Sequence, residues 1–307
     1  MPNYESKITR ENAKALEGTQ EIINEILQGV VQKSAILGKM TRLPDMTSSQ
    51  ASMPVLNALP EAYWVEGDDG LKQTTSMAWK NKYLYAKEIA VLVPIPKAVL
   101  DDSSYDIWGQ VRPRVEEAAY KVIDEALITG TNKPAGFREA LIPSIIASGN
   151  VVPFDANATT YDRISDAMSL VEQDGYDVNG LLGGVALKGE FRKGLVDANG
   201  QPLANSEITE LPKTFIKNGA WDPSLAQFIV GDFTQAVYSF RQDVTFEIFD
   251  TGVITDNDGK VIYNLLQQDA VCLRMVLRLG WELPNGANIT NPDEESRFPF
   301  ALAEANA

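Results

Sequence analysis

Histidine is absent from this chain of 307 residues, and that absence removes whole classes of chemistry. Histidine is the commonest general base and the commonest metal ligand near neutral pH. Without it the chain holds no Ser-His-Asp or Cys-His catalytic set, and no zinc site of a type that contains histidine. Chemistry carried by carboxylates or lysines remains open on composition alone.

Cysteine is nearly absent as well, because Cys272 is the only one. A single cysteine cannot form an intrachain disulfide, which fits a reducing compartment. Cys272 stands in an apolar strand pattern, and free cysteine behaves as a small hydrophobic residue. We therefore interpret it as part of the core.

Long apolar runs are missing too. The longest, such as residues 89–95, fall well short of the roughly 20 residues needed to cross a bilayer. The first residues contain no basic segment followed by an apolar one, so we expect no secretory signal. These two absences predict a protein without a membrane partner.

Basic residues are few relative to acidic ones: 27 lysines and arginines stand against 42 aspartates and glutamates, which gives a net charge of −15. Such a surface repels nucleic acid over a Debye length of roughly 10 Å, so we expect no tight DNA binding by the bulk of the protein. Hydrophobic residues make up 44% and charged residues 22%, an ordinary globular composition. The length allows one large domain or two small ones.

The motifs that would carry catalysis or cofactor binding are incomplete. Residues 180–184 (GLLGG) lack the Gly-Lys-Ser/Thr ending of a phosphate loop. Residues 256–259 (DNDG) lack the later bidentate acid of a calcium loop, so we interpret them as a hairpin turn. Neighbouring acids point about 100° apart on a helix, which favours caps and a solvated face over an acid-base dyad. The pairs concerned are Asp101/Asp102, Glu116/Glu117 and Asp124/Glu125. No catalytic residue, metal site or cofactor site is predicted.

Apolar spacing predicts three helices in the middle of the chain. The longest covers residues 105–129, about 37 Å at 1.5 Å per residue, and Pro113 is a point where it kinks or restarts. A second helix begins after the cap at Thr159 and ends near Gly175. A third covers residues 187–196.

Extended patterns lie on both sides of these helices. After Pro223 we expect strands at residues 228–230, 244–249, 261–265 and 270–279. Near the N-terminus, a short amphipathic helix within residues 11–37 is followed by extended chain through residues 36–43 and 52–56. The opening 57 residues show little compact pattern, which is typical of an arm that lies across a neighbouring subunit.

An aromatic-rich hairpin is the most distinctive local feature. Residues 63–65, the turn signal at 66–70 and the run at 71–92 predict two strands around a Gly/Asp cluster. Such a ribbon has too little bulk for a core of its own, so it should project or pack on a partner. Its candidate subunit-interface residues are Tyr63, Trp64, Lys72, Trp79, Lys80, Tyr83 and Tyr85.

Short blocks of the sequence resemble the major capsid protein family of tailed bacteriophages, whose fold is shared with encapsulin shells. The blocks occur in the family's order between about residues 20 and 283. They are 62–67 (AYWVEG), 89–96 (IAVLVPIP), 99–107 (VLDDSSYDI), 130–136 (GTNKPAG), 195–203 (LVDANGQPL), 230–236 (VGDFTQA) and 274–280 (RMVLRLG). No one block is decisive, but the collinear set is specific.

The resemblance implies an α+β fold of four parts. They are an N-terminal arm at residues 1–57, an extended β-hairpin loop at 58–93, a peripheral domain with a long spine helix at 94–130 and 239–279, and an axial domain with the C-terminal tail at 131–238 and 280–307. The implied function is that of a major capsid protein, a self-assembling structural subunit of an icosahedral phage head around double-stranded DNA. Neither enzymatic activity nor a cofactor is implied.

The implied partner is the chain itself, in pentamers and hexamers. Scaffold, portal and decoration proteins are further partners that the family allows, and the DNA is enclosed without sequence-specific binding. The implied location is the virion, with the host cytoplasm during assembly. Family members often carry a scaffolding segment before the arm. Because the arm here starts almost at Met1, a separate scaffold, no scaffold and an already processed chain all stay open.

Some relatives join a lysine and an asparagine of neighbouring subunits through an isopeptide bond, with a carboxylate to take the lysine's proton. The hairpin carries Lys72, Lys80 and Lys82, and Asn257 and Asn264 stand in the candidate partner loop. The strand that follows, at residues 270–277, has no acid. The pattern therefore favours surface lysines over a cross-link.

Two alternative functions stay open. An encapsulin, a bacterial nanocompartment shell of the same fold, is the nearest one, and terminase, portal and protease genes beside this one would argue for a phage instead. An acidic cytosolic carboxylate-dependent enzyme is the second, and a deep pocket in a monomer or small oligomer would mark it.

Overall fold

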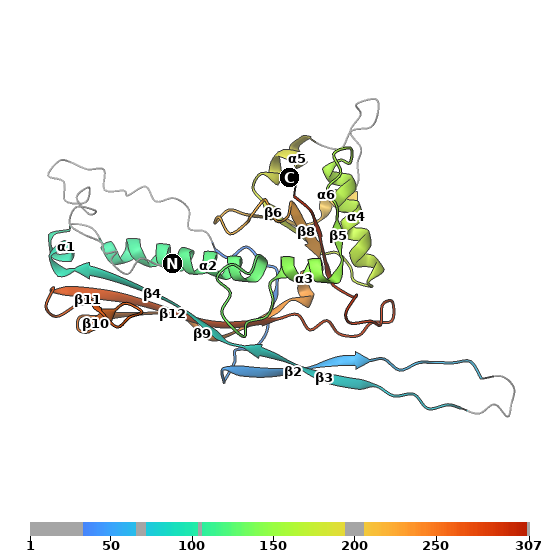
Figure 1. Ribbon diagram of the computed structural model, residues 1–307, viewed down its shortest axis with the longest axis horizontal. Coiled ribbons are helices and arrows are strands. Elements are labelled where there is room, and N and C mark those ends of the chain that lie inside the picture. Colours follow the sequence, from blue (N-terminus) through green and yellow to red (C-terminus); the bar gives the residue numbers. More distant parts are fainter. Residues whose placement is uncertain (1–32, 66–71, 104–105, 194–205, 306–307) are drawn as a thin grey trace. The chain divides into compact units, whose positions relative to one another are not determined.

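The computed structural model describes residues 33–65, 72–103, 106–193 and 206–305, and the chain divides into two compact units (Figure 1). Unit 1 includes Glu88–Tyr120 and Gln242–Arg278, and unit 2 includes Ser34–Lys87, Lys121–Arg241 and Leu279–Ala307. Four of the described elements have residues in both units: helix α2 (Ile107–Ile128) and strands β4 (Lys87–Pro96), β9 (Val237–Phe249) and β12 (Ala270–Glu282).

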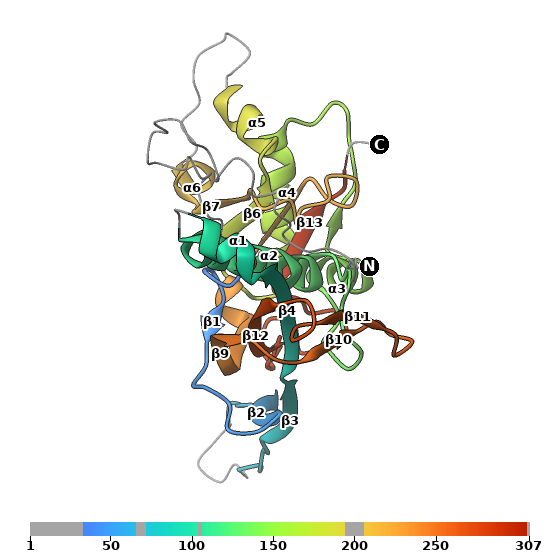
Figure 2. The ribbon, with the colours of Figure 1, turned by 90° about the vertical axis from the view of Figure 1, so that its left-hand side faces the viewer.

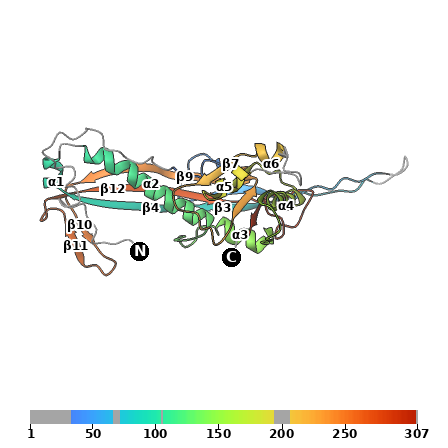
Figure 3. The same cartoon turned by 90° about the horizontal axis from the view of Figure 1, so that it is seen from above.

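Unit 1 is built on the long strands β9 and β12, which are neighbours in a four-stranded sheet of order β1-β9-β12-β4. Strand β4 spans Lys87–Pro96, and β1 (Thr41–Arg42) pairs in parallel with the unit 2 end of β9. Helix α1 (Lys97–Asp102) follows β4 directly, and the first half of α2 runs along the sheet (Figure 3). The buried cluster of Ile95, Val99 and Ile107 joins the end of β4 to both helices.

A small hairpin completes unit 1. Strand β10 (Val253–Thr255) pairs antiparallel with β11 (Val261–Asn264). Its tip confirms the predicted turn: Gly259 donates its N–H to the Asp256 carbonyl and has a φ of 79°, which glycine adopts without strain. Close by in the same unit, Cys272 is buried and its burial raises the pKa of the thiol, so the core interpretation of this residue is confirmed.

Unit 2 contains a five-stranded mixed sheet of order β5-β13-β8-β6-β7. These strands are β5 (Val151–Val152), β13 (Phe300–Ala303), β8 (Phe228–Gly231), β6 (Gly180–Gly184) and β7 (Lys213–Ile216). Strand β8 runs antiparallel to both its neighbours, while β5 and β7 join the outer sides in parallel. The central strands are apolar throughout because both of their faces are covered.

Helix α4 (Thr160–Gln173) covers one face of this sheet (Figure 2). Its residues Ile164, Ala167 and Val171 are fully buried in one cluster with Phe228 and Val230. These helix positions recur at steps of three and four, and the strand positions at steps of two, as expected for facing apolar surfaces. The core of unit 2 lies between them.

The start of α4 is set by the local sequence. The Thr159 hydroxyl accepts the Asp162 N–H at 3.2 Å, and the Asp162 carboxylate accepts the Thr159 N–H at 2.9 Å, which makes a capping box. The Thr159 hydroxyl also donates to the Asp162 carboxylate at 2.7 Å, and this bond, together with the one from the Thr159 N–H, lowers the pKa of Asp162. Gly175, with a φ of 80°, follows the end of the helix. Both predicted boundaries are confirmed.

The other short elements described in unit 2 are α3 (Leu141–Ser148), α5 (Leu187–Lys193), α6 (Ser206–Glu210) and the 3-10 turn η2 (Phe233–Gln235). The start of α5 confirms the third predicted helix, whose last residues, 194–196, lie outside the described residues. Helix α3 was not predicted, because a short apolar run does not distinguish a helix from a buried strand.

The predicted long helix is confirmed as α2, which continues through Pro113 as one element. A restart at Pro113 is thereby excluded, although the proline lacks one backbone hydrogen bond. After it, Val115, Ala119 and Ile123 form a buried stripe at steps of four. The prediction of a solvated face is wrong for Asp124, which is 0% exposed, because segments distant in sequence cover it.

The hairpin strands differ from the prediction. Strand β2 (Gln50–Ala58) pairs antiparallel with β3 (Ala78–Tyr85), whereas β4 belongs to the four-stranded sheet. Residues 63–65, expected to be the first strand, are in no strand, and the expected turn at 66–70 lies outside the described residues. Strand β2 confirms the extended chain that alternation predicted at residues 52–56, but its pairing with β3 was not predicted, because local alternation does not show which strand lies alongside.

Within residues 36–43, expected to be extended, residues 36–39 form a turn instead, whereas Thr41–Arg42 form the short strand β1 as expected. The N–H groups of Lys39 and Met40 both donate to the Ile36 carbonyl, at 2.9 and 3.2 Å. Residues 11–32 of the expected amphipathic helix lie outside the described residues. The turn replaces the strand because Asp124, which is distant in sequence, accepts hydrogen bonds at its start.

A glycine substitution tests how closely β8 and β13 approach. A Cβ on Gly231 would meet the Pro299 carbonyl oxygen and lie 2.5 Å from Phe300 Cδ1. We expect Gly231→Ala to lower the free energy of unfolding by about 1–3 kcal/mol, measured by urea denaturation. Gly189→Ala in α5 is the control of opposite sign, because its Cβ meets only Arg192, at 3.9 Å, and alanine favours a helix by about 0.5–1 kcal/mol. Equal effects of the two substitutions would contradict the close approach.

Candidate subunit interface

The β2–β3 ribbon has two chemically different faces. Cross-strand partners share a face, and the register pairs Leu56 with Trp79 and Val55 with Lys80. The outer face consists of Gln50, Ser52, Pro54, Leu56, Trp79, Asn81, Tyr83 and Tyr85. The inner face consists of Ala51, Met53, Val55, Lys80, Lys82 and Leu84. All of these residues belong to unit 2.

Apolar contacts hold one end of the inner face. Leu84 is buried in a cluster with Met46 and Ala86. Two backbone hydrogen bonds join the ribbon to other segments of unit 2: the Met46 N–H, just before β2, donates to the Phe240 carbonyl at 2.7 Å, and the Ala287 N–H donates to the Leu56 carbonyl at 2.9 Å. The ribbon is thus attached to the body of unit 2 near both ends of β2.

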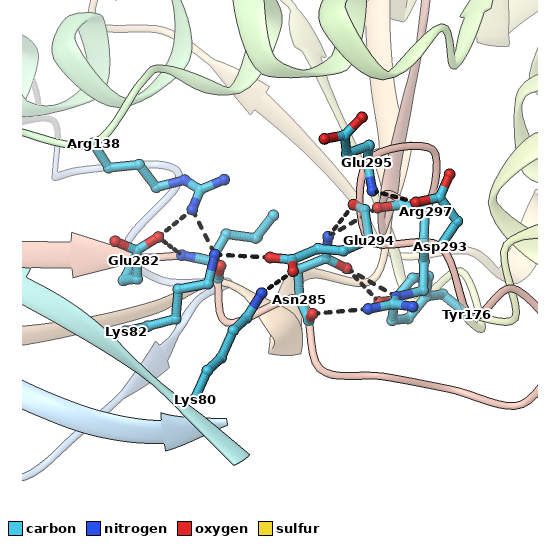
Figure 4. A network of polar contacts seen from close by, with 11 residues as sticks. Lys80, Lys82, Arg138, Tyr176, Glu282, Asn285, Asp293, Glu294, Glu295 and Arg297 are labelled. Atoms are coloured by element: carbon cyan, nitrogen blue, oxygen red, sulfur yellow. Dashed lines mark hydrogen bonds and ion pairs between the residues drawn. The ribbon is translucent and has the colours of Figure 1, made fainter. Parts of the chain in front are cut away.

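A single carboxylate holds the middle of the inner face (Figure 4). The Lys82 amine donates to Glu294 Oε1 at 3.0 Å, and the Lys80 amine forms an ion pair with the other oxygen of Glu294. Burial lowers the pKa of both lysines from the ordinary value of 10.5. The positive charges of neighbouring Lys80 and Arg138 lower the pKa of Lys82 further, while Glu282 opposes this.

Arg297, which is 2% exposed, holds the backbone of the loop that carries Glu294 (Figure 4). Its guanidinium donates to the Asn285 side-chain oxygen at 3.2 Å, the Asn285 carbonyl at 3.0 Å and the Asn291 carbonyl at 2.7 Å. The Tyr176 hydroxyl donates to the same Asn285 side-chain oxygen at 2.8 Å, and burial raises the pKa of this tyrosine. Asn285 in turn donates to the Glu294 carbonyl at 3.2 Å.

Asp174, at the end of α4, is a second buried group that orders this loop. Its carboxylate accepts the side-chain amides of Asn150 and Asn291, both at 2.8 Å, and the N–H of Phe298 at 3.0 Å. The loop is therefore tied to the five-stranded sheet and to α4 at several points. Glu294 is presented to the ribbon from a firmly held backbone.

The outer face carries large side chains that the subunit leaves uncovered. Among its aromatic residues, Trp79 is 63% exposed, Tyr83 42% and Tyr85 43%. Isolated exposed apolar residues are ordinary, but three aromatic rings along one face of a ribbon are typical of an interaction surface. Beyond the strands the two chains stay together, because the Tyr63 hydroxyl donates to the Gln73 carbonyl at 2.7 Å. Trp64, beside it, is 98% exposed.

The seven predicted interface residues do not form one surface. Trp79, Tyr83 and Tyr85 share the outer face, while Tyr63, Trp64 and Lys72 are exposed beyond the paired strands. Lys80 points to the opposite side and is bound by Glu294. The alternation of lysines and aromatic residues along β3 was a usable signal for this division. No signal in the sequence pointed to Glu294 or Arg297, because their partners are distant in the chain.

Two searches of the described residues bear on other functions. They contain no group of three or more cysteines, aspartates and glutamates placed to hold a metal ion. No helix in the described ranges is both long enough and apolar enough to cross a membrane.

Comparison with known proteins identifies the family. The model of the phage capsid family matches residues 19–290. The chain belongs to the phage capsid family. A curated relative, the major capsid protein of Staphylococcus phage 80alpha, is 26% identical over 271 residues, which cover 84% of this chain and 79% of the relative.

Solved structures have a similar fold. A structure from Microbacterium phage Oxtober96 has a TM-score of 0.82 and 34% identity, covering 98% of this chain and 100% of that one. One from Mycobacterium phage Adephagia has a TM-score of 0.83 and 25% identity, covering 98% and 99%. The capsid of a native GTA particle computed with C5 symmetry has a TM-score of 0.65 and 17% identity, covering 96% and 99%.

The resemblance seen in the sequence is therefore confirmed. The protein is a major capsid protein of a tailed-phage head, a structural component of the icosahedral virion shell and not an enzyme. Its mixed α+β fold is the one that phage major capsid proteins share. The carboxylate-dependent enzyme is excluded, and the phage relatives decide against the encapsulin.

We call the ion pairs of Lys80 and Lys82 with Glu294 the lysine clamp. The interaction energy between Lys82 and Glu294 can be measured with a double-mutant cycle of Lys82→Met and Glu294→Gln. We expect a coupling energy of about 0.2–1 kcal/mol from urea denaturation, smaller in 1 M salt, because both groups are partly exposed. The matched control is the more exposed pair of Lys97 and Asp269 in unit 1, 3.3 Å apart, for which we expect coupling near zero. A coupling energy no larger than the control's would contradict the clamp.

Proposed function

We propose that the outer face of the β2–β3 ribbon is the surface with which each capsid subunit grips its neighbour, and that the subunits assemble as pentamers and hexamers. The observation that carries this proposal is the exposure of Trp79, Tyr83 and Tyr85 on a ribbon whose other face is fixed to its own subunit. Aromatic anchors of this kind often contribute about 2 kcal/mol or more each at an interface.

The fixed inner face supports this role. A loosely attached ribbon would lose conformational freedom on meeting a neighbour, and that loss weakens binding. Here Glu294 holds Lys80 and Lys82, and Leu84 is buried, before any neighbour arrives. The outer face is therefore presented in one orientation. Closed symmetry then repeats the same contact around the shell.

The proposal extends to the shell as a whole. The capsid of the GTA particle, which has a similar fold, was computed with C5 symmetry, and fivefold symmetry supports pentamers in this protein too. The net charge of −15 suits a container whose lining does not adhere to the enclosed double-stranded DNA, since no sequence-specific contact is needed. Assembly would take place in the host cytoplasm, and portal, decoration and scaffold proteins are further partners that the family allows.

We also infer the four-part division of the family for this chain. The N-terminal arm would take residues 1–57, the peripheral domain 94–130 and 239–279, and the axial domain with the tail 131–238 and 280–307. The extended hairpin loop of residues 58–93 would then draw its first paired strand, β2, from the end of the arm. The N-terminal arm and the hairpin loop are thus joined twice, by the continuous chain at the end of β2 and by the pairing of β2 with β3.

Self-assembly of the purified chain tests the pentamers and hexamers. We expect light scattering and electron microscopy to show closed particles, or pentamers and hexamers, at high protein concentration. A species of 33.7 kDa alone under those conditions would contradict the proposal.

Substitutions on the outer face test its role. We expect Trp79→Ser combined with Tyr83→Ser to abolish particle formation, because two anchors are removed. The free energy of unfolding should change by less than about 0.5 kcal/mol, since both side chains are exposed. Asn81→Ser, between them on the same face, is the matched control and should assemble normally. Normal particle yield from the folded double variant would refute the role of this face.

A further inference from the structure

Asp124 is a buried carboxylate without a cationic partner among the described residues. It lies in the unit 2 part of α2 and is 0% exposed. Its oxygens accept the Ser34 hydroxyl at 2.5 Å, the Ala35 N–H at 3.1 Å and the Asn218 side-chain amide at 2.6 Å. The Ile36 N–H also contributes a hydrogen bond. Two segments distant in sequence thus meet on one charged group.

The segment attached in this way begins a compact turn. The Ser34 hydroxyl oxygen accepts the Leu37 N–H at 3.1 Å, and the Met40 N–H donates to the Ile36 carbonyl at 3.2 Å. The side chains of Ile36, Leu37 and Met40 are all buried. Because the chain is continuous, every residue that precedes Ser34 leads into unit 2 through this turn.

We propose that Asp124, Ser34 and Asn218 form a proton-coupled clasp, which fixes the start of the first segment of unit 2 and opens more readily at neutral pH than in mild acid. The clasp differs from the lysine clamp, where lysines neutralise the carboxylate of Glu294. An ionised carboxylate that is buried with hydrogen bonds alone is only partly compensated for the loss of water.

The direction of the pH dependence follows from linkage. Burial, the largest effect, raises the pKa of Asp124 above its ordinary value of 3.8, and the hydrogen bonds from Ser34, Ala35 and Asn218 oppose it. Opening the clasp returns the carboxylate to water and to its ordinary pKa. Closing therefore takes up a proton between these two values. In that range the opening constant rises with pH by up to about tenfold per pH unit, and above it the opening constant is constant.

We assign the pH dependence of clasp opening to Asp124 and not to the other charged groups near it. On α2, Lys121 and Glu125 face each other at 3.6 Å. On the turn, the Lys39 amine donates to the Pro212 carbonyl at 3.1 Å, and Lys33 is exposed. Lys217, beside Asn218, is exposed as well. Histidine is absent, so no imidazole titrates in the range.

The role of the clasp rests on the proposed function. An N-terminal arm that comes to lie across a neighbouring subunit during assembly needs an attachment that opens at neutral pH. Its test does not depend on assembly. Hydrogen–deuterium exchange of the full-length chain between pH 4 and 7.5, corrected for the intrinsic exchange rate, reports the opening of residues 34–40. We expect protection there to fall severalfold as the pH rises from 4, and then to level off.

Three variants complete the experiment. Asp124→Asn should remove the pH dependence of protection at residues 34–40. Ser34→Ala removes a donor that favours the ionised form, so it should move the upper end of the pH-dependent range to higher pH. Glu125→Gln, on the same helix turn, is the control and should keep the wild-type dependence.

Each outcome decides the question. Protection that is independent of pH in the wild type, or a dependence that Asp124→Asn retains, would overturn the clasp. Circular dichroism establishes whether the variants fold. Should Asp124→Asn not fold, the Ser34→Ala variant decides alone, because an unmoved pH range would assign the dependence to another group. Failure to form shells would leave these readings unaffected.

Discussion

A two-stranded ribbon has two faces, and its own subunit can cover only one of them; the hairpin of this capsid protein is organised around that constraint. Side chains alternate along a strand, so the register that buries Leu84 also leaves Tyr83 and Tyr85 exposed. A slip of one residue would turn the aromatic rings inward and expose both lysines that bind Glu294. The pairing register therefore decides which chemistry a neighbouring subunit meets.

Polar contacts hold the inner face of the ribbon. Such contacts fix the orientation of the ribbon more than they stabilise the fold. A buried cation such as Arg297 is tolerated because the oxygens of Asn285 and Asn291 surround it. Buried ionic groups of this kind add little net stability over an apolar core, but their directional bonds specify one arrangement. The result is a loop that places Glu294 at one point beneath the ribbon. A binding surface prepared in this way loses less entropy on association.

A chain without histidine has few groups that change charge near neutral pH. Any dependence on pH there must therefore come from carboxylates and lysines whose pKa is shifted from its ordinary value. Asp124 and Lys82 are two such groups: burial raises the pKa of Asp124 and lowers the pKa of Lys82. They lie at two places within unit 2 where segments distant in sequence are joined, at the turn after Ser34 and along the ribbon. Charge and attachment are thus linked in a protein that needs no active site.

The sequence by itself determined the features whose causes are local: the length of α2, the capping box that starts α4, the turn between β10 and β11, and the aromatic alternation along β3. The family blocks determined the function. Only the tertiary structure decided that β2 pairs with β3, that residues 36–39 turn instead of extending, and that Asp124 is buried. Each of these depends on a partner many residues away, such as Ser34 lying against Asp124. Hydrophobic periodicity reports which side of an element is apolar, but not which distant segment will cover it.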